Sequence, residues 1–250
     1  TISYFQQAIE NDPGYVLAYT GLADTHLVLA DWGYLSTKEV VPLIRGFLDK
    51  SLELDNTLSE NHSSLMYLSF LEWEWQQAEK ESRIAFELNP KSPVAHHFYA
   101  LIQALSGKFR NSIEHNSRSR ELDPLSLIFN YACGLIMYMS RQYDDAIKQL
   151  RKALEIDNNF TPAYFLISFS YLQKSMHTEA IEEYQNLLLR NTITEKYVPL
   201  IERIFKKSGI EGFLNWLVDE GLSLEIGIYN LPYQLAICCS LLNDREAAFK

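Results

Sequence analysis

The sequence has few basic residues, no long apolar run and little cysteine. Its 250 residues include 22 Lys and Arg against 32 Asp and Glu, which gives a net charge of −10. A nucleic-acid surface needs clustered positive charge, so we expect this region to contact no nucleic acid. No apolar run approaches the roughly 18 residues of a membrane span, and no signal-peptide pattern is present, so we also expect no membrane span in this region.

Residue patterns that carry catalytic or metal chemistry are also missing. Cys133, Cys238 and Cys239 show neither metal-ligand spacing nor a disulfide framework, and the six histidines form no His-Glu-x-x-His pair. The neighbouring His96 and His97 would point about 100° apart on a helix, which suits no shared metal. Glycine-rich phosphate loops and a Gly-x-Ser-x-Gly motif do not occur. We therefore expect no enzyme activity, no catalytic residue, no metal ligand and no cofactor.

What the chain does contain is a motif that returns every 34 residues. Asn89-Pro90, Asp123-Pro124 and Asp157-Asn158 close stretches with a small residue and an acidic residue at the same spacing, as in Ala85-Phe86-Glu87-Leu88. Such a period indicates stacked units that bury hydrophobic surface only against their neighbours. Within residues 141–157, apolar side chains recur at three- and four-residue steps, which indicates helix. We read the chain as all α, with an architecture that favours binding over catalysis.

The 34-residue pattern resembles the tetratricopeptide repeat over the whole chain. The resemblance implies a right-handed superhelical solenoid of antiparallel helix pairs, one domain over residues 1–250. The units are expected at 16–58, 59–92, 93–126, 127–160, 161–194 and 195–228, with partial units at 1–15 and 229–250. Because the chain would begin and stop inside helices, we expect it to be a piece of a longer protein.

Three positions of each unit support this register because they carry mostly small residues, which let helices pack closely. Position 8 holds Ala23, Met66, Ala100, Gly134, Ser168, Glu202 and Ala236. Position 20 holds Ile44, Ala78, Ser112, Ala146, Ala180, Leu214 and Ala248. Position 27 holds Ala8, Ser51, Ala85, Ser119, Ala153, Leu187 and Gly221.

The first full unit departs from the pattern by nine extra residues between its helices, centred on 31–37. Trp32 and Tyr34 make this segment either a tolerated surface loop or a loop that contacts a partner. Ser36 with Glu39 predicts a capping box at the start of the following helix, whereas Pro42 predicts a kink or a delayed start.

The unit at 195–228 is expected to be the least regular. Glu202 occupies a helix-contact position, where an unpaired carboxylate would be costly, so the unit must tilt or pair Glu202 with Arg203 or Lys206. Elsewhere, acidic pairs such as Asp144-Asp145 and Glu182-Glu183 are expected on outer, solvated helix surfaces.

The resemblance also indicates a binding surface, because the first helices of successive units line a concave groove in this family. Positions 2, 5, 9, 12 and 13 of each unit face that groove. Here they are apolar and aromatic and end in a basic patch, the composition of an interface with few but large anchors. The predicted partner-binding residues are Tyr67, Leu101, Tyr131, Leu135, Tyr138, Phe165, Phe169, Arg203, Lys206 and Lys207. The alternative is that several of them serve packing alone.

Particular stretches are similar to one bacterial arrangement of these repeats. They are residues 8–13 followed by residues 17–24, the turn Glu72-Trp73-Glu74-Trp75 with Ala78-Glu79, and the segment Leu122-Asp123-Pro124-Leu125-Ser126. The resemblance implies a sensory or scaffolding module attached to a winged-helix, cyclase or protein-kinase effector. We predict a non-catalytic module that binds a protein or peptide, in the cytoplasm by default and in the periplasm if a membrane span lies elsewhere. The alternative is an element for self-association or for docking on its own effector domain.

Overall fold

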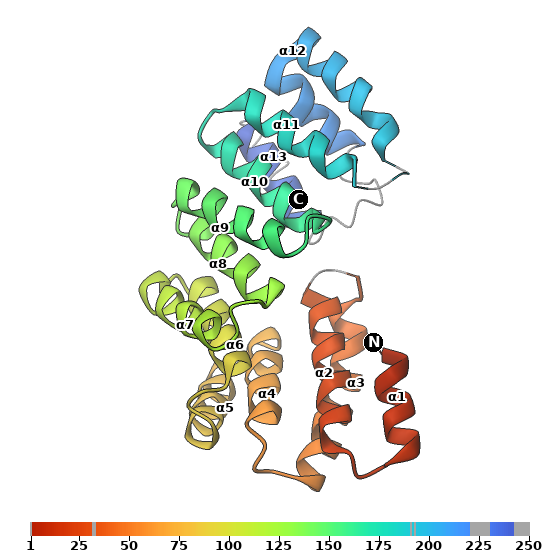
Figure 1. Cartoon of the computed structure of the whole chain (residues 1–250), viewed down its shortest axis with the longest axis vertical. Helices are drawn as coiled ribbons and strands as arrows, with labels where there is room; N and C mark the ends of the chain where they lie inside the picture. Colours follow the sequence, from red (N-terminus) through yellow and green to blue (C-terminus); the bar gives the residue numbers. More distant parts are fainter. Residues whose placement is uncertain (1, 32–33, 191, 193, 221–230, 243–250) are drawn as a thin grey trace. The chain divides into compact units, whose positions relative to one another are not determined.

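The computed structural model describes residues 2–31, 34–190, 192, 194–220 and 231–242. Within these residues every regular element is a helix, and none is a strand (Figure 1). The predicted all-α fold of antiparallel helix pairs is therefore confirmed. Ala248, Gly221 and Trp32 lie outside the described residues.

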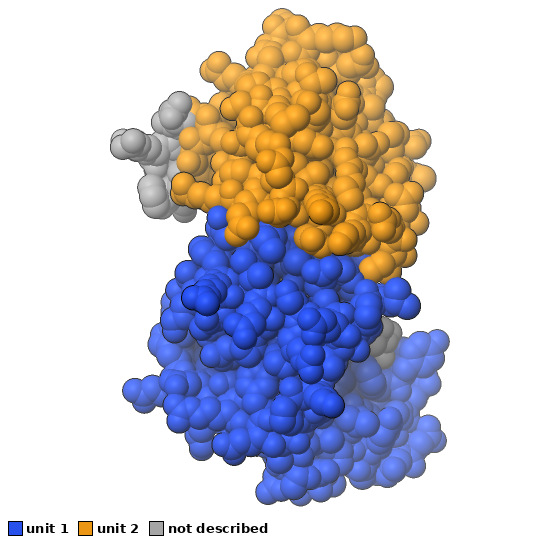
Figure 2. Space-filling model, turned by 60° about the vertical axis from the view of Figure 1, so that its left-hand side comes forward, with its two compact units in different colours: residues 1–140 blue, residues 141–250 orange. Residues whose placement is uncertain are grey.

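The chain divides into two compact units, residues 1–140 and 141–250 (Figure 2). The first holds α1 (Ile2–Asn11), α2 (Val16–Asp31), α3 (Thr37–Leu54), α4 (Ser59–Leu71), α5 (Trp75–Leu88), α6 (Pro93–Leu105), α7 (Phe109–Leu122) and α8 (Leu127–Met139). The second holds α9 (Tyr143–Ile156), α10 (Thr161–Gln173), α11 (His177–Leu188), the short η1 (Glu195–Tyr197), α12 (Val198–Asp219) and α13 (Leu231–Leu241).

The helix starts follow the sequence repeat. α4, α6, α8 and α10 begin at residues 59, 93, 127 and 161, which are the first residues of four predicted units. Local chemistry explains two of these starts. The side chains of Ser92 and Ser126 accept hydrogen bonds from the amides of Ala95 and Phe129 and so satisfy one free donor at each helix N-terminus.

The paired helices touch through the small residues at positions 8 and 20. In the α6–α7 pair, the Ser112 hydroxyl donates a hydrogen bond of 2.7 Å to the carbonyl oxygen of Ala100. In the α10–α11 pair the roles are exchanged, and the Ser168 hydroxyl donates to the carbonyl oxygen of Ala180 at 2.7 Å. All four residues are fully buried. A side chain can reach the facing backbone only where the two helices are very close, so small residues are required here.

The turn inside each helix pair is also periodic. Position 15 of four successive units has a positive φ angle: 65° at Trp73, 74° at Gly107, 62° at Arg141 and 57° at Ser175. This left-handed conformation costs a residue with a Cβ atom roughly 1–2 kcal/mol, whereas glycine adopts it freely. The turns at Trp73, Arg141 and Ser175 therefore carry this conformational cost, because the repeat geometry requires a positive φ angle there.

A third periodic feature closes the turn between successive units. The side chain at position 4 donates a hydrogen bond to the residue six positions earlier, over 2.6 to 3.1 Å. The five pairs are Tyr19 with Pro13, His62 with Asn56, His96 with Pro90, Asn130 with Pro124, and Tyr164 with Asn158. Tyrosine, histidine and asparagine all reach this acceptor, which explains why position 4 shows no single residue type in the sequence.

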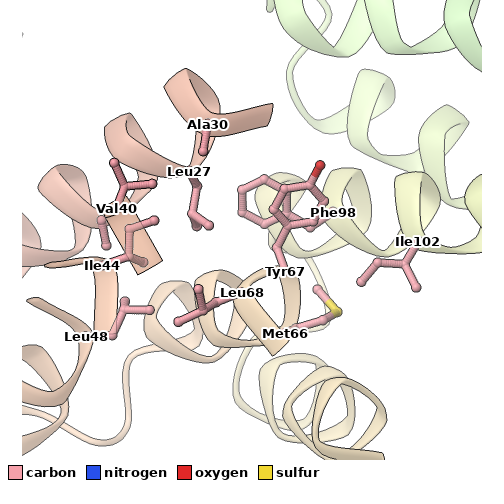
Figure 3. Packing of buried hydrophobic residues seen from close by; sticks show 11 residues of the cluster. Leu27, Ala30, Val40, Ile44, Leu48, Met66, Tyr67, Leu68, Phe98 and Ile102 are labelled. Carbon is pink, nitrogen blue, oxygen red and sulfur yellow. The ribbon is translucent and has the colours of Figure 1, made fainter. Parts of the chain in front are cut away.

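One buried hydrophobic cluster joins α2, α3, α4 and α6 (Figure 3). Leu27 of α2, Ile44 of α3, Leu68 of α4 and Phe98 of α6 are among its members. Each helix contributes one side of the cluster and none could bury its apolar face alone, as expected for stacked units. The sequence predicted that the nine extra residues of the first full unit all separate its helices, and this is wrong: α2 has 16 residues and α3 has 18, against 13 and 14 in α4 and α5, so most of the insertion lengthens the two helices.

Two local predictions are corrected by the structure. Ser36 is the residue before α3, but its side chain makes no capping hydrogen bond, so the capping box does not form. The delayed start is also wrong, because α3 begins at Thr37 and continues through Pro42. Proline removes only one backbone donor, and the buried side chains of Val40 and Ile44 hold this turn against the core.

The acidic residues Glu202 and Glu183 behave differently from expectation. Glu202 is exposed, not buried, and pairs with Lys206 over 2.6 Å as predicted. The non-helical backbone of Gly209, inside α12, makes this unit irregular. Glu183 is buried, not solvated, and accepts a bidentate pair of hydrogen bonds from the Arg151 guanidinium, one of them over 3.0 Å. The expectation for Glu183 was wrong because α9 lies close enough to supply a cation.

Enlarging a close helix contact should destabilise the protein. Ala180→Leu adds side-chain volume where α10 and α11 touch, and we expect the free energy of unfolding to fall by about 1–3 kcal/mol. Glu182→Leu, on the exposed side of the same helix, is the matched control and should change it by less than about 0.5 kcal/mol. Urea denaturation measures both. Equal effects of the two substitutions would contradict the close contact.

Candidate functional site

The predicted binding residues lie on what we call the first-helix face, formed by positions 2, 5, 9, 12 and 13 of the units. In residues 1–140, α2 packs on α4, α4 on α6 and α6 on α8, so the first helices form an unbroken row. Tyr67, Leu101, Tyr131, Leu135 and Tyr138 belong to this row. Phe165 and Phe169 on α10, and the three cations on α12, belong to the second compact unit.

Three of the predicted aromatic residues are buried. Tyr67 stacks on Phe98 with ring centroids 4.8 Å apart, and only 2% of its surface is exposed (Figure 3). Phe169 is fully buried and stacks on Phe165 at 4.2 Å, and Tyr138 is 6% exposed. Truncating Phe169 to alanine would cost about 3–5 kcal/mol of folding stability. These three rings therefore contribute to the packing of the first helices and expose little area to a ligand.

Four predicted residues are accessible in part. Leu101, Tyr131, Leu135 and Phe165 are half-buried, which leaves apolar atoms available to a ligand. Leu101 also packs against the large core cluster, so its side chain is held in place from below. Tyr131 and Leu135 lie one helical turn apart on α8 and share one face of it.

The predicted basic residues Arg203, Lys206 and Lys207 are all exposed on α12. Lys206 is paired with Glu202, which reduces the net positive charge of this patch. Exposed charges of this kind are screened by salt over about 8–10 Å. These cations can therefore affect the orientation of a partner more than the affinity for it.

Sequence reasoning missed Asp24, which occupies position 9 of the first full unit. The same position holds Tyr67, Leu101 and Leu135 in the next three units, so a carboxyl group there stands out once the register is extended to α2. Asp24 is half-buried and accepts a hydrogen bond from the Ser64 hydroxyl. Burial is the main cause that raises the pKa of Asp24 to about 7; the bond from Ser64 opposes this rise, and the nearby Glu60 carboxylate adds to it. No ion pair of the described residues includes Asp24.

His97 lies at position 5 of its unit and is held between aromatic rings. Its ring centroid is 5.5 Å from that of Phe98 and 5.0 Å from that of Phe129. Burial lowers the pKa of His97 to about 4, so the ring is neutral at physiological pH. Its Nδ1 atom has no hydrogen-bond partner within the described residues. This histidine fills space in an aromatic environment.

Two other histidines at position 4 form pairs with the second helix of their unit. His62 Nδ1 donates to Glu81 over 2.6 Å, and this bond raises the pKa of His62. His96 Nδ1 lies 3.0 Å from His115 Nδ1, and burial lowers the pKa of both rings. His96 donates to a backbone carbonyl through Nε2, so a neutral His96 accepts at Nδ1 from His115. Both interactions join the first helix of a unit to its second helix and so stabilise the helix pair.

The described residues contain no group of three or more His, Cys, Asp or Glu side chains arranged to hold a metal ion. None of the described helices is long and apolar enough to cross a membrane. The first-helix face carries partly accessible apolar side chains together with buried aromatic rings, an arrangement suited to contact with another polypeptide.

Comparison with known proteins gives matches in structure only. No protein-family model and no curated protein sequence matches the chain. Human IFIT1, solved as a dimer with PPP-AAAA, is similar with a TM-score of 0.65 at 17% identity over 99% of this chain and 65% of that one. PilF of Pseudomonas aeruginosa gives 0.53 at 14% identity, covering 92% and 89% of the two chains. MamA gives 0.52 at 20% identity, covering 64% and 94%.

These similarities establish the fold of the chain. PilF and MamA are tetratricopeptide proteins, and the chain has the tetratricopeptide fold, as its 34-residue period predicted. Identities of 14 to 20% carry no information about a shared partner. The chain spans 65% of the length of IFIT1.

The two histidine pairs should give opposite pH dependences of stability. The raised pKa of His62 means that its contribution is complete below pH 6.5 and is lost as the pH rises through the folded pKa. The lowered pKa values of His96 and His115 mean that their contribution is complete above pH 6.5 and is lost as the pH falls. We expect the stability difference between wild type and His62→Gln to grow on acidification, and that for His115→Gln to shrink.

Urea denaturation between about pH 5.5 and pH 8.5 measures both differences. Each variant serves as the control for the other, because a general acid effect would move both differences in the same direction. Parallel pH profiles would contradict the assigned pairings.

Proposed function

We propose that this chain is a non-catalytic binding module that holds a segment of a protein or peptide on its first-helix face. The observation that carries the proposal is the row of half-buried apolar residues on adjacent first helices, Leu101 on α6 with Tyr131 and Leu135 on α8. Their accessible atoms provide hydrophobic contact area. Leu101 packs against the buried cluster that contains the stacked rings of Tyr67 and Phe98, which holds its side chain in place and lowers the entropy cost of binding.

The chemistry of the chain supports a polypeptide partner. The tetratricopeptide fold also occurs in human IFIT1, whose structure contains the oligonucleotide PPP-AAAA. The present chain carries a net charge of −10, and its first-helix face in residues 1–140 includes the carboxyl groups of Asp24 and Glu60. Phosphate groups would be repelled by such a surface. An apolar protein segment meets no comparable barrier.

The proposal extends to the second compact unit as a separate surface. Phe165 offers an apolar contact, and Arg203, Lys206 and Lys207 would attract acidic groups of the partner. Since these cations are exposed, they would affect the association rate and orientation more than the affinity.

We further propose that the module is the sensory or scaffolding part of a bacterial regulatory protein. The support is the motif resemblance around Glu72-Trp73-Glu74-Trp75 and at 122–126. We assign it to the cytoplasm, or to the periplasm if the longer protein spans a membrane. Self-association, or docking on an effector domain, is the alternative use of the same apolar face.

Removing the accessible apolar side chains of α8 should weaken binding. The probe is a peptide selected on the wild-type protein from a random phage-displayed library. We expect the double variant Tyr131→Ala with Leu135→Ala to bind it at least about tenfold more weakly, because burial of each side chain contributes roughly 1.5–3 kcal/mol and 1.4 kcal/mol is tenfold. Calorimetric titration measures the affinity, and raising the salt concentration should change it only modestly.

Leu125→Ala is the matched control, since Leu125 is 79% exposed and lies outside the first-helix face. Urea denaturation of each variant separates a loss of binding from a loss of folding. Unchanged affinity of the double variant would place the binding site elsewhere. Light scattering of the protein alone at several concentrations tests the alternative, because a strict monomer rules out self-association.

A further inference from the structure

Trp73 occupies the turn between α4 and α5 in a way that the fold does not require. Its φ angle is 65° and its side chain is 75% exposed. The equivalent positions of the next three units hold Gly107, Arg141 and Ser175 with similar φ angles. The same turn therefore forms with no side chain, with a flexible cation or with a small hydroxyl group. A large aromatic residue here is exposed to water and is strained as well.

The neighbouring Trp75 has a different environment. Its ring lies edge-on to Phe70 at 5.2 Å, so it packs on the end of α4. Equivalent positions in the next two units hold Phe109 and Tyr143, which indicates that an aromatic residue at the start of the second helix belongs to the repeat. Trp73 contacts Trp75 in an edge-to-face arrangement, with ring centroids 5.4 Å apart. Trp75 thus anchors the pair, and Trp73 presents its ring to solvent.

Trp73 has an acidic residue on each side in the sequence. Glu72 and Glu74 flank Trp73 in the sequence, and Glu72 pairs with Arg45 of α3. Glu74 is exposed, and no ion pair among the described residues includes it. An exposed indole face attracts a cation through the ring quadrupole, and an exposed carboxylate on the next residue of the turn attracts it through its charge. The net charge of −10 adds a long-range attraction for basic partners.

We propose that the α4–α5 turn, centred on Trp73 and Glu74, is a docking site for an arginine side chain on a basic segment of a partner protein. This site lies outside the first-helix face and does not depend on the function proposed for that face. The planar guanidinium stacks on the indole of Trp73 while its N–H groups donate to the Glu74 carboxylate. Arginine fits better than lysine because its cation is planar and more weakly hydrated.

The test uses a blocked Gly-Arg-Gly-Arg-Gly peptide, and a counterpart in which citrulline replaces arginine removes the charge but keeps the shape. Titration followed through the indole N–H signals in ¹H–¹⁵N spectra should give a saturable shift of Trp73 with the arginine peptide only. Trp73→Gly should weaken binding by about three- to fivefold, the size of an exposed cation–π contact. Glu74→Gln should weaken it as well and reduce its salt dependence.

Weaker binding of Trp73→Gly should not result from unfolding, because the next unit already has glycine, Gly107, at the equivalent position of its turn. Its melting temperature is expected to equal or exceed that of the wild type. Tyr4→Ala is the matched control, since Tyr4 on α1 is also 75% exposed. The Tyr131→Ala and Leu135→Ala double variant should retain arginine-peptide binding, which keeps this site distinguishable from the first-helix face.

Three results would overturn the proposal. Equal affinity of wild type and Trp73→Gly would remove Trp73 from any site. Equal binding of the citrulline peptide would show a merely apolar surface. A wild-type dimer in sedimentation velocity that Trp73→Gly converts to monomer would identify a second copy of this chain as the occupant.

Discussion

Close approach of two helices within each pair is the constraint on which the rest of this structure depends. At Ala100 with Ser112, and at Ser168 with Ala180, a serine hydroxyl of one helix reaches the backbone carbonyl of the other. A larger side chain at either position would force the helices apart and disturb packing on the next pair, since each pair completes the core of its neighbour. The small residues at positions 8, 20 and 27 are thus determined by geometry and leave other positions free to vary.

Two further periodic features maintain the same geometry at the turns. A residue in left-handed conformation reverses the chain inside each pair, and a side-chain hydrogen bond from position 4 closes the turn before each pair. Both tolerate different residue types: the first is a requirement on the backbone, and the second is met by any side chain that can donate over the same distance. This tolerance lets one turn carry Trp73 and lets position 4 carry the titratable His62 and His96 without loss of the fold. In such a molecule, functional residues are best sought at positions where the side chain is larger or more reactive than the repeat geometry requires.

The repeat register predicted which residues occupy the first-helix face, but not how exposed each of their side chains is. The repeat register placed Tyr67, Leu101 and Leu135 at equivalent positions, yet Tyr67 is buried against Phe98 whereas the two leucines remain accessible. A repeat pattern assigns a residue to a face but does not report the size of the side chain that the next helix places against it. For the same reason Glu183 was assigned to solvent, although Arg151 of a neighbouring helix covers it.

The sequence by itself determined the all-α fold, the 34-residue register and the small residues at the helix contacts. These properties depend on local periodicity and on the distance between neighbouring units, and both are present in the order of residues. Only the tertiary structure decided which aromatic residues are buried, how the histidines pair, and that Asp24 and Trp73 stand in unusual environments. Those properties depend on side chains that meet across helices about 20 to 40 residues apart in the chain, where volume, charge and solvent access are set jointly by several neighbours.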